Sequence, residues 1–212
     1  MLEVVPNITD TSVDALTRKA LTAGQFVSAI HIDVSDESLI PNVVGVDMHT
    51  LKSALDAVPK LFVEAHLVVT NPDKYLSQLV NAGVKRIILQ LESNDPRHFL
   101  ELANYEEIEV IMAIDAPTAI EEIEPFLEEV VGVHVLTAEM GGQHPPFLPE
   151  TVEKIIKIRQ SYPDLFISAE GSIRKAEIRT LQEAGVTRIV TSKSIFDDMG
   201  SVGDAISELQ AA

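Results

Sequence analysis

The sequence predicts an α/β fold, a single (β/α)8 or TIM barrel, from three observations. Short apolar runs recur along the chain, and each is followed by a polar turn and a stretch of helical periodicity. Eight such units fit into 212 residues, which is the size of a minimal barrel. No Gly-x-Gly-x-x-Gly pattern follows the first apolar run, which disfavours the alternative, a doubly wound open sheet. We therefore expect residues 1–212 to form one barrel domain.

The apolar runs are the predicted strands, and the periodic stretches between them are the predicted helices. In chain order the strands cover residues 3–8, 26–33, 61–68, 86–91, 109–114, 132–136, 165–169 and 188–191. The helices cover residues 13–22, 47–57, 72–81, 96–103, 118–128, 149–161, 174–183 and 201–210. Three helices are followed by Ala-Gly, at 23–24, 82–83 and 184–185, where glycine is typical of a left-handed helix C-cap.

The composition disfavours several classes of function. The chain carries 33 acidic and 16 basic residues, a formal net charge of -17, so we expect neither nucleic acid nor an anionic membrane as a partner. The absence of cysteine excludes disulfides, thiolate zinc sites and cysteine nucleophiles. The sequence has no basic and apolar leader and no run of 18 apolar residues, so we expect a soluble cytoplasmic protein.

Polar side chains at the ends of predicted strands indicate a site at the barrel mouth, where the chemistry of such barrels takes place. His31 and Asp33 are two residues apart, so they point to the same side of their strand. His66 and Glu170 lie near the ends of the third and seventh strands. Two imidazoles and two carboxylates suit one divalent ion, Zn, Mn, Fe or Co. A tight protonation network without metal is the alternative.

Several segments resemble, in order and spacing, the motifs of the ribulose-phosphate 3-epimerase family. They are HIDVSD at 31–36, IPN at 40–42, HLVVTNP at 66–72, GGQ at 141–143, EGSI at 170–173 and SIF at 194–196. The resemblance implies a (β/α)8 barrel and a metal-dependent isomerase that inverts C3 of a ketose phosphate. Its substrates would be D-ribulose 5-phosphate and D-xylulose 5-phosphate of the pentose phosphate pathway, interconverted through an enediolate. It also implies a homo-oligomer.

The resemblance assigns roles to the four polar residues at the strand ends. Asp33 and Glu170 would be the two acids that exchange a proton on opposite faces of the substrate, and His31 and His66 would bind the metal with them. The chemistry is consistent, because a cation that polarises a ketose carbonyl brings the neighbouring C–H proton within reach of a carboxylate.

The sequence departs from the family pattern in the acid and in the floor of the site. Glu170 stands where the family usually has Asp. Ser35, Val68 and His134 occupy positions where the family commonly has methionine, so they form an additional candidate pocket. By strand parity His134 points into the barrel, where it could join the metal, bond a carboxylate or fill space. We favour the hydrogen-bonding role, because another protein ligand would block the positions that substrate needs.

The candidate phosphate site is the most altered part. Its residues are Asp10, Gly141, Gly142, Gly171, Ser172, Ser192 and Lys193. The glycines allow close backbone approach to an anion, and Lys193 would add a positive charge against the negative Glu139. Asp10 falls near a family serine, but it could equally cap the helix that begins at Val13. These changes leave two alternatives: an epimerase or isomerase for a different or unphosphorylated sugar, and a catalytically silent protein that binds a ligand or partner.

Overall fold

The computed structural model describes residues 2–41, 45–141, 145–197 and 201–212, in which eight parallel strands form one sheet. The strands are β1 (Glu3–Pro6), β2 (Ala29–Ser35), β3 (Phe62–Val68), β4 (Arg86–Gln90), β5 (Glu109–Ile114), β6 (Gly132–Leu136), β7 (Phe166–Glu170) and β8 (Arg188–Thr191). They are ordered β1-β8-β7-β6-β5-β4-β3-β2, and an isolated parallel bridge between Asn7 and His31 joins the two ends. The predicted (β/α)8 barrel is confirmed, and the open-sheet alternative is wrong.

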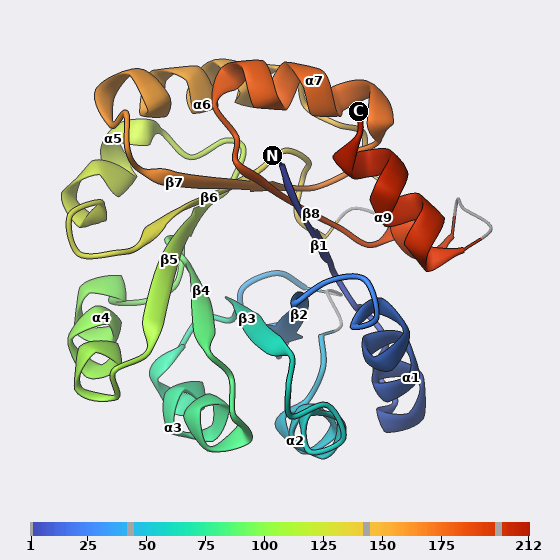
Figure 1. Cartoon of the computed structure of the whole chain (residues 1–212). Coiled ribbons are helices and arrows are strands. Elements are labelled where there is room, and N and C mark those ends of the chain that lie inside the picture. Colours follow the sequence, from blue (N-terminus) through green and yellow to red (C-terminus); the bar gives the residue numbers. More distant parts are fainter. Residues whose placement is uncertain (1, 42–44, 142–144, 198–200) are drawn as a thin grey trace.

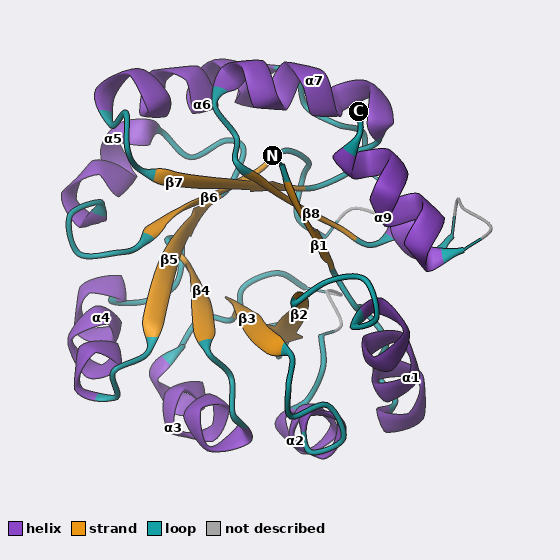
Figure 2. Cartoon of the chain, viewed as in Figure 1, coloured by secondary structure: helices purple, strands orange, loops and turns teal. Residues whose placement is uncertain are grey.

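The helices form an outer ring around the strands (Figures 1 and 2). They are α1 (Val13–Ala23), α2 (Met48–Leu55), α3 (Asp73–Ala82), α4 (Pro96–Tyr105), α5 (Ile120–Ile123), α6 (Glu150–Ser161), α7 (Lys175–Ala184), α8 (Lys193–Phe196) and α9 (Val202–Gln210), with a 3-10 turn at Glu124–Phe126. The main apolar core fills the layer between strands and helices. In the described part of the chain, no helix is long and apolar enough to cross a membrane.

Three predictions of local structure are wrong. The second strand begins at Ala29 and not at residue 26, because Phe26 is half exposed and packs beside Gly203 of α9. The helix predicted at 118–128 ends at Ile123 and gives way to the 3-10 turn, since Pro125 has no backbone N–H to donate. Gly24 is a right-handed cap with φ -63°, whereas Gly83 and Gly185 take the expected left-handed conformation. Gly24 instead allows close packing, because an added Cβ would lie 2.9 Å from Leu61.

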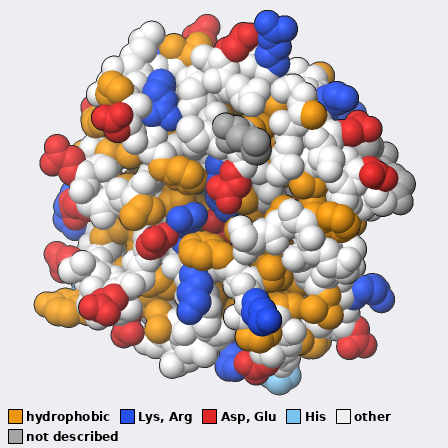
Figure 3. Space-filling view, viewed as in Figure 1, with side chains coloured by type: hydrophobic (Ala, Val, Ile, Leu, Met, Phe, Trp, Pro, Cys, Tyr) orange, Lys and Arg blue, Asp and Glu red, His pale blue; other side chains and the backbone are white. Residues whose placement is uncertain are grey.

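The inside of the barrel mixes small apolar clusters with buried charge. Val5, Ala29 and Val190 form one cluster, and Ile88, Ile111 and Ala113 form another. Glu64 and Arg188 are fully buried, with Arg188 Nη2 2.7 Å from Glu64 Oε1. On the outside, acidic side chains are spread over the visible face with lysines and arginines between them (Figure 3). The excess negative charge is thus distributed and is not gathered in one patch on this face.

Candidate functional site

The register of the sheet brings four predicted site residues together. Asp33 of β2 is paired with His66 of β3, and His31 lies two residues before Asp33 on the same strand face. Glu170 is the last residue of β7. Each of these four residues offers one nitrogen or oxygen atom, and the four atoms all lie within 4.8 Å of one another. The sequence pattern therefore corresponds to one compact cluster of possible metal ligands.

The contacts within this cluster run through one oxygen of each acid. Asp33 Oδ1 lies 3.3 Å from His31 Nε2 and 3.4 Å from His66 Nδ1. Glu170 Oε2 lies 3.4 Å from His31 Nε2 and 3.9 Å from His66 Nδ1. The rings of His31 and His66 are almost completely buried, whereas the two acids are partly open. The carboxylates are therefore accessible to a small molecule, while the imidazoles are held beneath them.

Hydrogen bonds on the far side of each ring fix which nitrogen faces the cluster. His31 Nδ1 lies 2.7 Å from Glu64 Oε1, so Nδ1 carries the hydrogen in that bond. His66 Nε2 lies 2.8 Å from Gln90 Oε1, and Gln90 in turn donates from Nε2 to Glu92. In the neutral tautomers, which a bound cation would require, this leaves the lone pairs of His31 Nε2 and His66 Nδ1 facing the side of the two carboxylates. Without a cation, His31 Nε2 carries a proton and donates it to Asp33. The donor set fits a divalent transition ion in number, type and orientation.

The electrostatics of the cluster favour a positive partner for the acids. Burial opposes a charge on His31, but the nearby carboxylates of Glu170, Asp33 and Glu64 outweigh burial and raise the pKa of His31 to about 10. Burial would raise the pKa of Asp33, but hydrogen bonds from His31 and His66 outweigh it and lower the pKa well below 3.8. The pKa of Glu170 is also lowered, since the charge of His31 offsets burial. Both acids are thus held as carboxylates, ready to accept a proton or to bind a cation.

His134 contacts Glu170 from the floor of the site. Its Nε2 lies 3.0 Å from Glu170 Oε2, and its Nδ1 lies 3.0 Å from the Ser168 hydroxyl. Burial lowers the pKa of His134, and Glu170 does not offset this fully, so the ring is neutral and donates from Nε2. Of the three roles considered for His134, hydrogen bonding to a carboxylate is the one that this geometry favours.

Asn7 was missed by sequence reasoning. It follows β1, and its Nδ2 donates to Asp33 Oδ2 at 2.9 Å and to Glu170 Oε1 at 2.6 Å. Asn7 fell inside the strand predicted at 3–8, close to its end, so a polar residue near the end of an apolar strand, the signal that identified His66, could have found it. Asp10, expected near this place, instead pairs with Lys19 at 2.8 Å, and Ser12 and not Asp10 caps α1.

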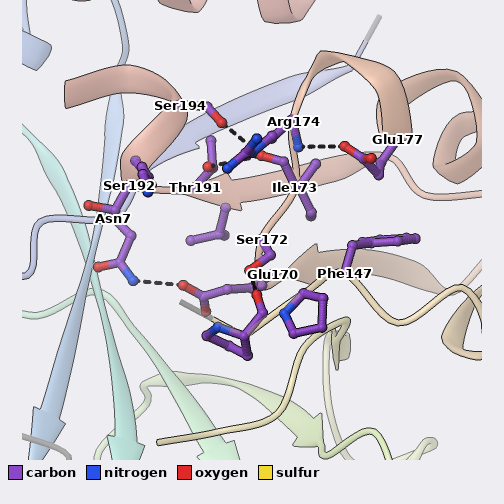
Figure 4. A pocket seen from close by; sticks show the side chains of 15 residues that line it. Asn7, Phe147, Glu170, Ser172, Ile173, Arg174, Glu177, Thr191, Ser192 and Ser194 are labelled. Atoms are coloured by element: carbon purple, nitrogen blue, oxygen red, sulfur yellow. Dashed lines mark hydrogen bonds between the residues drawn. The ribbon is translucent and has the colours of Figure 1, made fainter. Parts of the chain in front are cut away.

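Two cavities open beside the acids. The larger, of about 580 Å3, adjoins Glu170 and contains most of the candidate phosphate residues (Figure 4). It is lined by Gly171, Ser172, Ser192 and Lys193, together with Arg174, which sequence reasoning missed. The smaller, of about 310 Å3, is lined by Asp33, His66, Val68, Glu139 and Gly141.

Two other predicted site residues are not among the described residues that line these cavities. The hydroxyl of Ser35 accepts a hydrogen bond from the backbone N–H of Glu37. Gly142 lies outside the described residues.

The backbone around the larger cavity combines a necessary glycine with a strained serine. Gly171 has φ +113°, and a Cβ there would lie 2.9 Å from the backbone nitrogen of Ala138. Ser172 has φ +52°, a left-handed conformation that is unfavourable for a residue other than glycine, asparagine or aspartate. Its hydroxyl donates to the carbonyl oxygen of Pro145. The loop after β7 is therefore tightly folded against the loop after β6, next to the carboxylate of Glu170.

Comparisons with known proteins point to one family. The sequence matches the model of the ribulose-phosphate 3 epimerase family over residues 4–196. A ribulose-phosphate 3-epimerase from Schizosaccharomyces pombe is 28% identical over 170 residues, which cover 79% of this chain and 74% of that protein. The cytoplasmic isoform of ribulose-phosphate 3-epimerase from Oryza sativa subsp. japonica is 30% identical over 186 residues, which cover 85% of this chain and 80% of that protein.

The fold is shared more widely than the sequence. The structure of 3-hexulose-6-phosphate synthase from Salmonella typhimurium aligns with a TM-score of 0.75 at 11% identity, covering 99% of this chain and 97% of that one. At that identity the likeness establishes the barrel alone. Because the family model spans nearly the whole chain, including the strands that carry His31, Asp33, His66 and Glu170, the chain belongs to the ribulose-phosphate 3-epimerase family.

Proposed function

We propose that this protein is a metal-dependent epimerase that inverts C3 of a ketose phosphate, interconverting D-ribulose 5-phosphate and D-xylulose 5-phosphate. The observation that carries the proposal is the cluster of Asp33, Glu170, His31 and His66, all within 4.8 Å at the barrel mouth. Family membership supports the same reaction. A divalent cation, Zn, Mn, Fe or Co, held by these four residues would act as a Lewis acid beside the substrate carbonyl.

The two carboxylates supply the acid and the base. One of the two, as a carboxylate, removes the proton of C3, and the electrons of that C–H bond move toward the carbonyl and give an enediolate. The other, which must enter the step in its protonated form, gives its proton to C3 on the opposite face and is left as a carboxylate. Asp33 and Glu170 are suited to these roles, because both are partly open to the cavities and the lowered pKa of each favours the carboxylate that the base requires, while the acid takes up its proton before turnover. In the reverse direction they exchange roles, so the protein uses the same two groups for both substrates.

The phosphate group would bind in the larger cavity. Lys193 and Arg174 offer positive charge there, and the backbone at Gly171, Ser172 and Ser192 offers N–H donors. Glu139 lines the smaller cavity and not the larger one, so its negative charge lies away from the proposed phosphate site. We propose that the positive side of the site receives the phosphate and the side with Glu139 does not.

The test of this function measures metal content and proton exchange together. Purified protein is expected to contain a stoichiometric divalent metal by elemental analysis and to exchange the C3 proton of D-ribulose 5-phosphate with solvent deuterium. Asp33→Asn and Glu170→Gln should each abolish inversion, since each removes one of the two proton carriers. A metal-loaded protein that exchanges no proton with any pentulose or hexulose phosphate would refute the proposal. A metal-free protein that retains an ordered His and carboxylate network would favour the catalytically silent alternative.

A different or unphosphorylated sugar is the second candidate substrate. The strained Ser172 in the loop after β7 favours it, because serine there has less backbone freedom for gripping a phosphate than glycine. Lys193→Met separates the two candidates: with a phosphorylated ketose we expect KM to rise by about 10-fold or more with little change in kcat. Lys175→Met, at an exposed lysine paired with Glu208, is the matched control. Preference for a free ketose in the parent protein would decide for the second candidate.

A homo-oligomeric state, a cytoplasmic location and a single domain spanning residues 1–212 stay predictions, and we propose them together with the function. The family resemblance supports the oligomer, and one relative carries a cytoplasmic isoform in its name. The proposed partner is therefore a small sugar phosphate, with neither nucleic acid nor a membrane expected for a chain of net charge -17.

A further inference from the structure

Asn7 is held rigidly at the seam where the barrel closes. Its backbone N–H donates to the carbonyl oxygen of Thr191 at 3.0 Å, and the N–H of the next residue, Ile8, donates to the carbonyl oxygen of His31 at 2.9 Å. The side chain of Asn7 is buried, with 5% of the residue exposed. A short side chain on a backbone fixed from both sides has few positions available to it. The placement of its amide group is therefore set by the fold.

That amide group contacts both acids at once. Asn7 Nδ2 lies 2.9 Å from Asp33 Oδ2 and 2.6 Å from Glu170 Oε1, and Figure 4 shows Asn7 and Glu170 pointing toward each other. Two carboxylates can only accept hydrogen bonds, so the nitrogen of the amide must face them. An NH2 group has two hydrogens and can donate one to each acid. Both acids contact the same nitrogen atom. These two hydrogen bonds therefore limit how far apart the two carboxylates can lie.

The contacts of Asn7 leave the candidate metal ligands free. Asn7 bonds Asp33 Oδ2 and Glu170 Oε1, whereas the opposite oxygens, Asp33 Oδ1 and Glu170 Oε2, face the nitrogens of His31 and His66. Each acid therefore has one oxygen for the metal cluster and one for Asn7. Outer hydrogen bonds of this kind fix the orientation of a ligating carboxylate. Glu170 is further restrained on Oε2 by His134 at 3.0 Å.

We propose that Asn7 is a positioning residue that sets the distance and the relative orientation of the two acids through its NH2 group. The proposal rests on the proposed function, in which Asp33 and Glu170 pass the proton between the faces of the substrate. The rate of proton transfer falls steeply when the reacting groups are misplaced by about 1 Å. A long and flexible acid such as Glu170 needs such support, because it has one more rotatable bond than aspartate.

A graded series of variants tests the proposal. Asn7→Ser keeps one donor hydrogen and Asn7→Ala keeps none. The matched control is Thr151→Val, which removes a buried hydroxyl of α6 that donates to the Leu148 carbonyl at 2.6 Å and does not touch the acids. We expect kcat to fall about 10- to 100-fold in Asn7→Ala with KM within roughly threefold, and to fall less in Asn7→Ser. Cobalt affinity, titrated through the visible absorption of bound Co(II), should fall about 10-fold or more in Asn7→Ala.

The outcomes separate this proposal from the proposed function. If the parent protein does not epimerise, the proposed function fails, and the cobalt titration together with a crystal structure of Asn7→Ala still decides the role of Asn7. Unmoved acids in that crystal structure, or an unchanged cobalt affinity, overturn the proposal. The proposal is also overturned if kcat falls equally in Asn7→Ser and Asn7→Ala, or if Thr151→Val shows the same fall in kcat as Asn7→Ala. If the parent turns over and Asn7→Ala keeps its kcat, the function stands and the proposal for Asn7 is wrong.

Discussion

Removing the charge of Arg188 should destabilise this barrel strongly, because Arg188 neutralises a carboxylate that has no access to water. Arg188 and Glu64 are both fully buried, and Arg188 Nη2 lies 2.7 Å from Glu64 Oε1. In Arg188→Met the methylene groups still fill part of the space, but the positive charge is gone. Apart from the imidazole of His31, the cation that remains near Glu64 among the described residues is Arg86, whose Nη1 is 3.6 Å from Glu64 Oε2 and whose side chain is partly exposed.

The size of the effect follows from the burial of both partners. Breaking a buried ion pair from one side costs about 3–5 kcal/mol, because the Glu64 carboxylate that remains loses the guanidinium that compensates its burial and keeps only His31 as a buried partner. A domain of this size loses about 2–4 °C in Tm for each kcal/mol, so Arg188→Met should melt roughly 10 °C below the parent. Glu64→Gln added to Arg188→Met removes the orphaned charge and keeps a carbonyl oxygen for His31. The double variant should therefore be more stable than the sum of the single effects predicts, by about 2 kcal/mol.

Urea unfolding followed by far-ultraviolet circular dichroism provides the measurement, since the chain has no tryptophan for a fluorescence assay. All four proteins of the double-mutant cycle are measured without metal, so that ligand binding does not enter the free energy of unfolding. Arg179→Met is the control, because Arg179 pairs with Glu183 on the exposed face of α7 and should contribute less than about 1 kcal/mol. A cost below about 1 kcal/mol for Arg188→Met, or additive single effects, would refute the reasoning.

Two further predictions concern acid stability and backbone strain. Burial raises the pKa of Glu64, but the contacts with His31 and Arg188 outweigh burial and lower this pKa from 4.5 to about 2. The charged Glu64 therefore stabilises the folded protein above pH 4.5, and this contribution is lost as the pH falls toward 2. That loss is about 3 kcal/mol, and Glu64→Gln should flatten the fall in Tm of metal-free protein between pH 4.5 and 2; an unchanged slope contradicts the assignment. Gly171→Ala, at φ +113° and with a Cβ 2.9 Å from Ala138 N, should cost more than Gly83→Ala, which carries only the strain of φ +91° and has free space around its Cβ. Strain alone costs about 1–2 kcal/mol, so equal losses of unfolding free energy in the two variants would show that no clash occurs at Gly171.

The barrel and the central cluster could be predicted because both depend on local periodicity. Alternation of apolar and polar residues along β2 places His31 and Asp33 on one face whatever the rest of the chain does. His66 and Glu170 followed from the rule that polar strand ends meet at the barrel mouth. The C-caps at Gly83 and Gly185 were predicted correctly for the same reason, since each depends on its own helix end.

The residues that support the cluster could not be predicted, because their burial is set by strands far away in the chain. Arg188 opens β8 and reads as an exposed strand end, yet the register of β7 and β8 pairs it with Ser168 inside the barrel. Glu64 also looks like a surface residue until His31 and Arg188 are seen beside it. Gly24 shows the same limit, because the contact that requires glycine comes from Leu61. Patterns within one segment do not contain such contacts.

The seam at Asn7 also dictates when the site can come into existence. Asn7 and Glu170 touch each other although 163 positions separate them in the chain. During synthesis the first three strands, with His31, Asp33 and His66, emerge long before β7, so the growing chain holds an incomplete set of the candidate metal ligands for most of its production. The side-chain amide of Asn7 can donate to both acids only after β8 has paired with β1 and closed the barrel. A cation that requires all four of these residues would therefore bind the finished barrel and not its precursors, and its binding energy would be added to the last step of assembly.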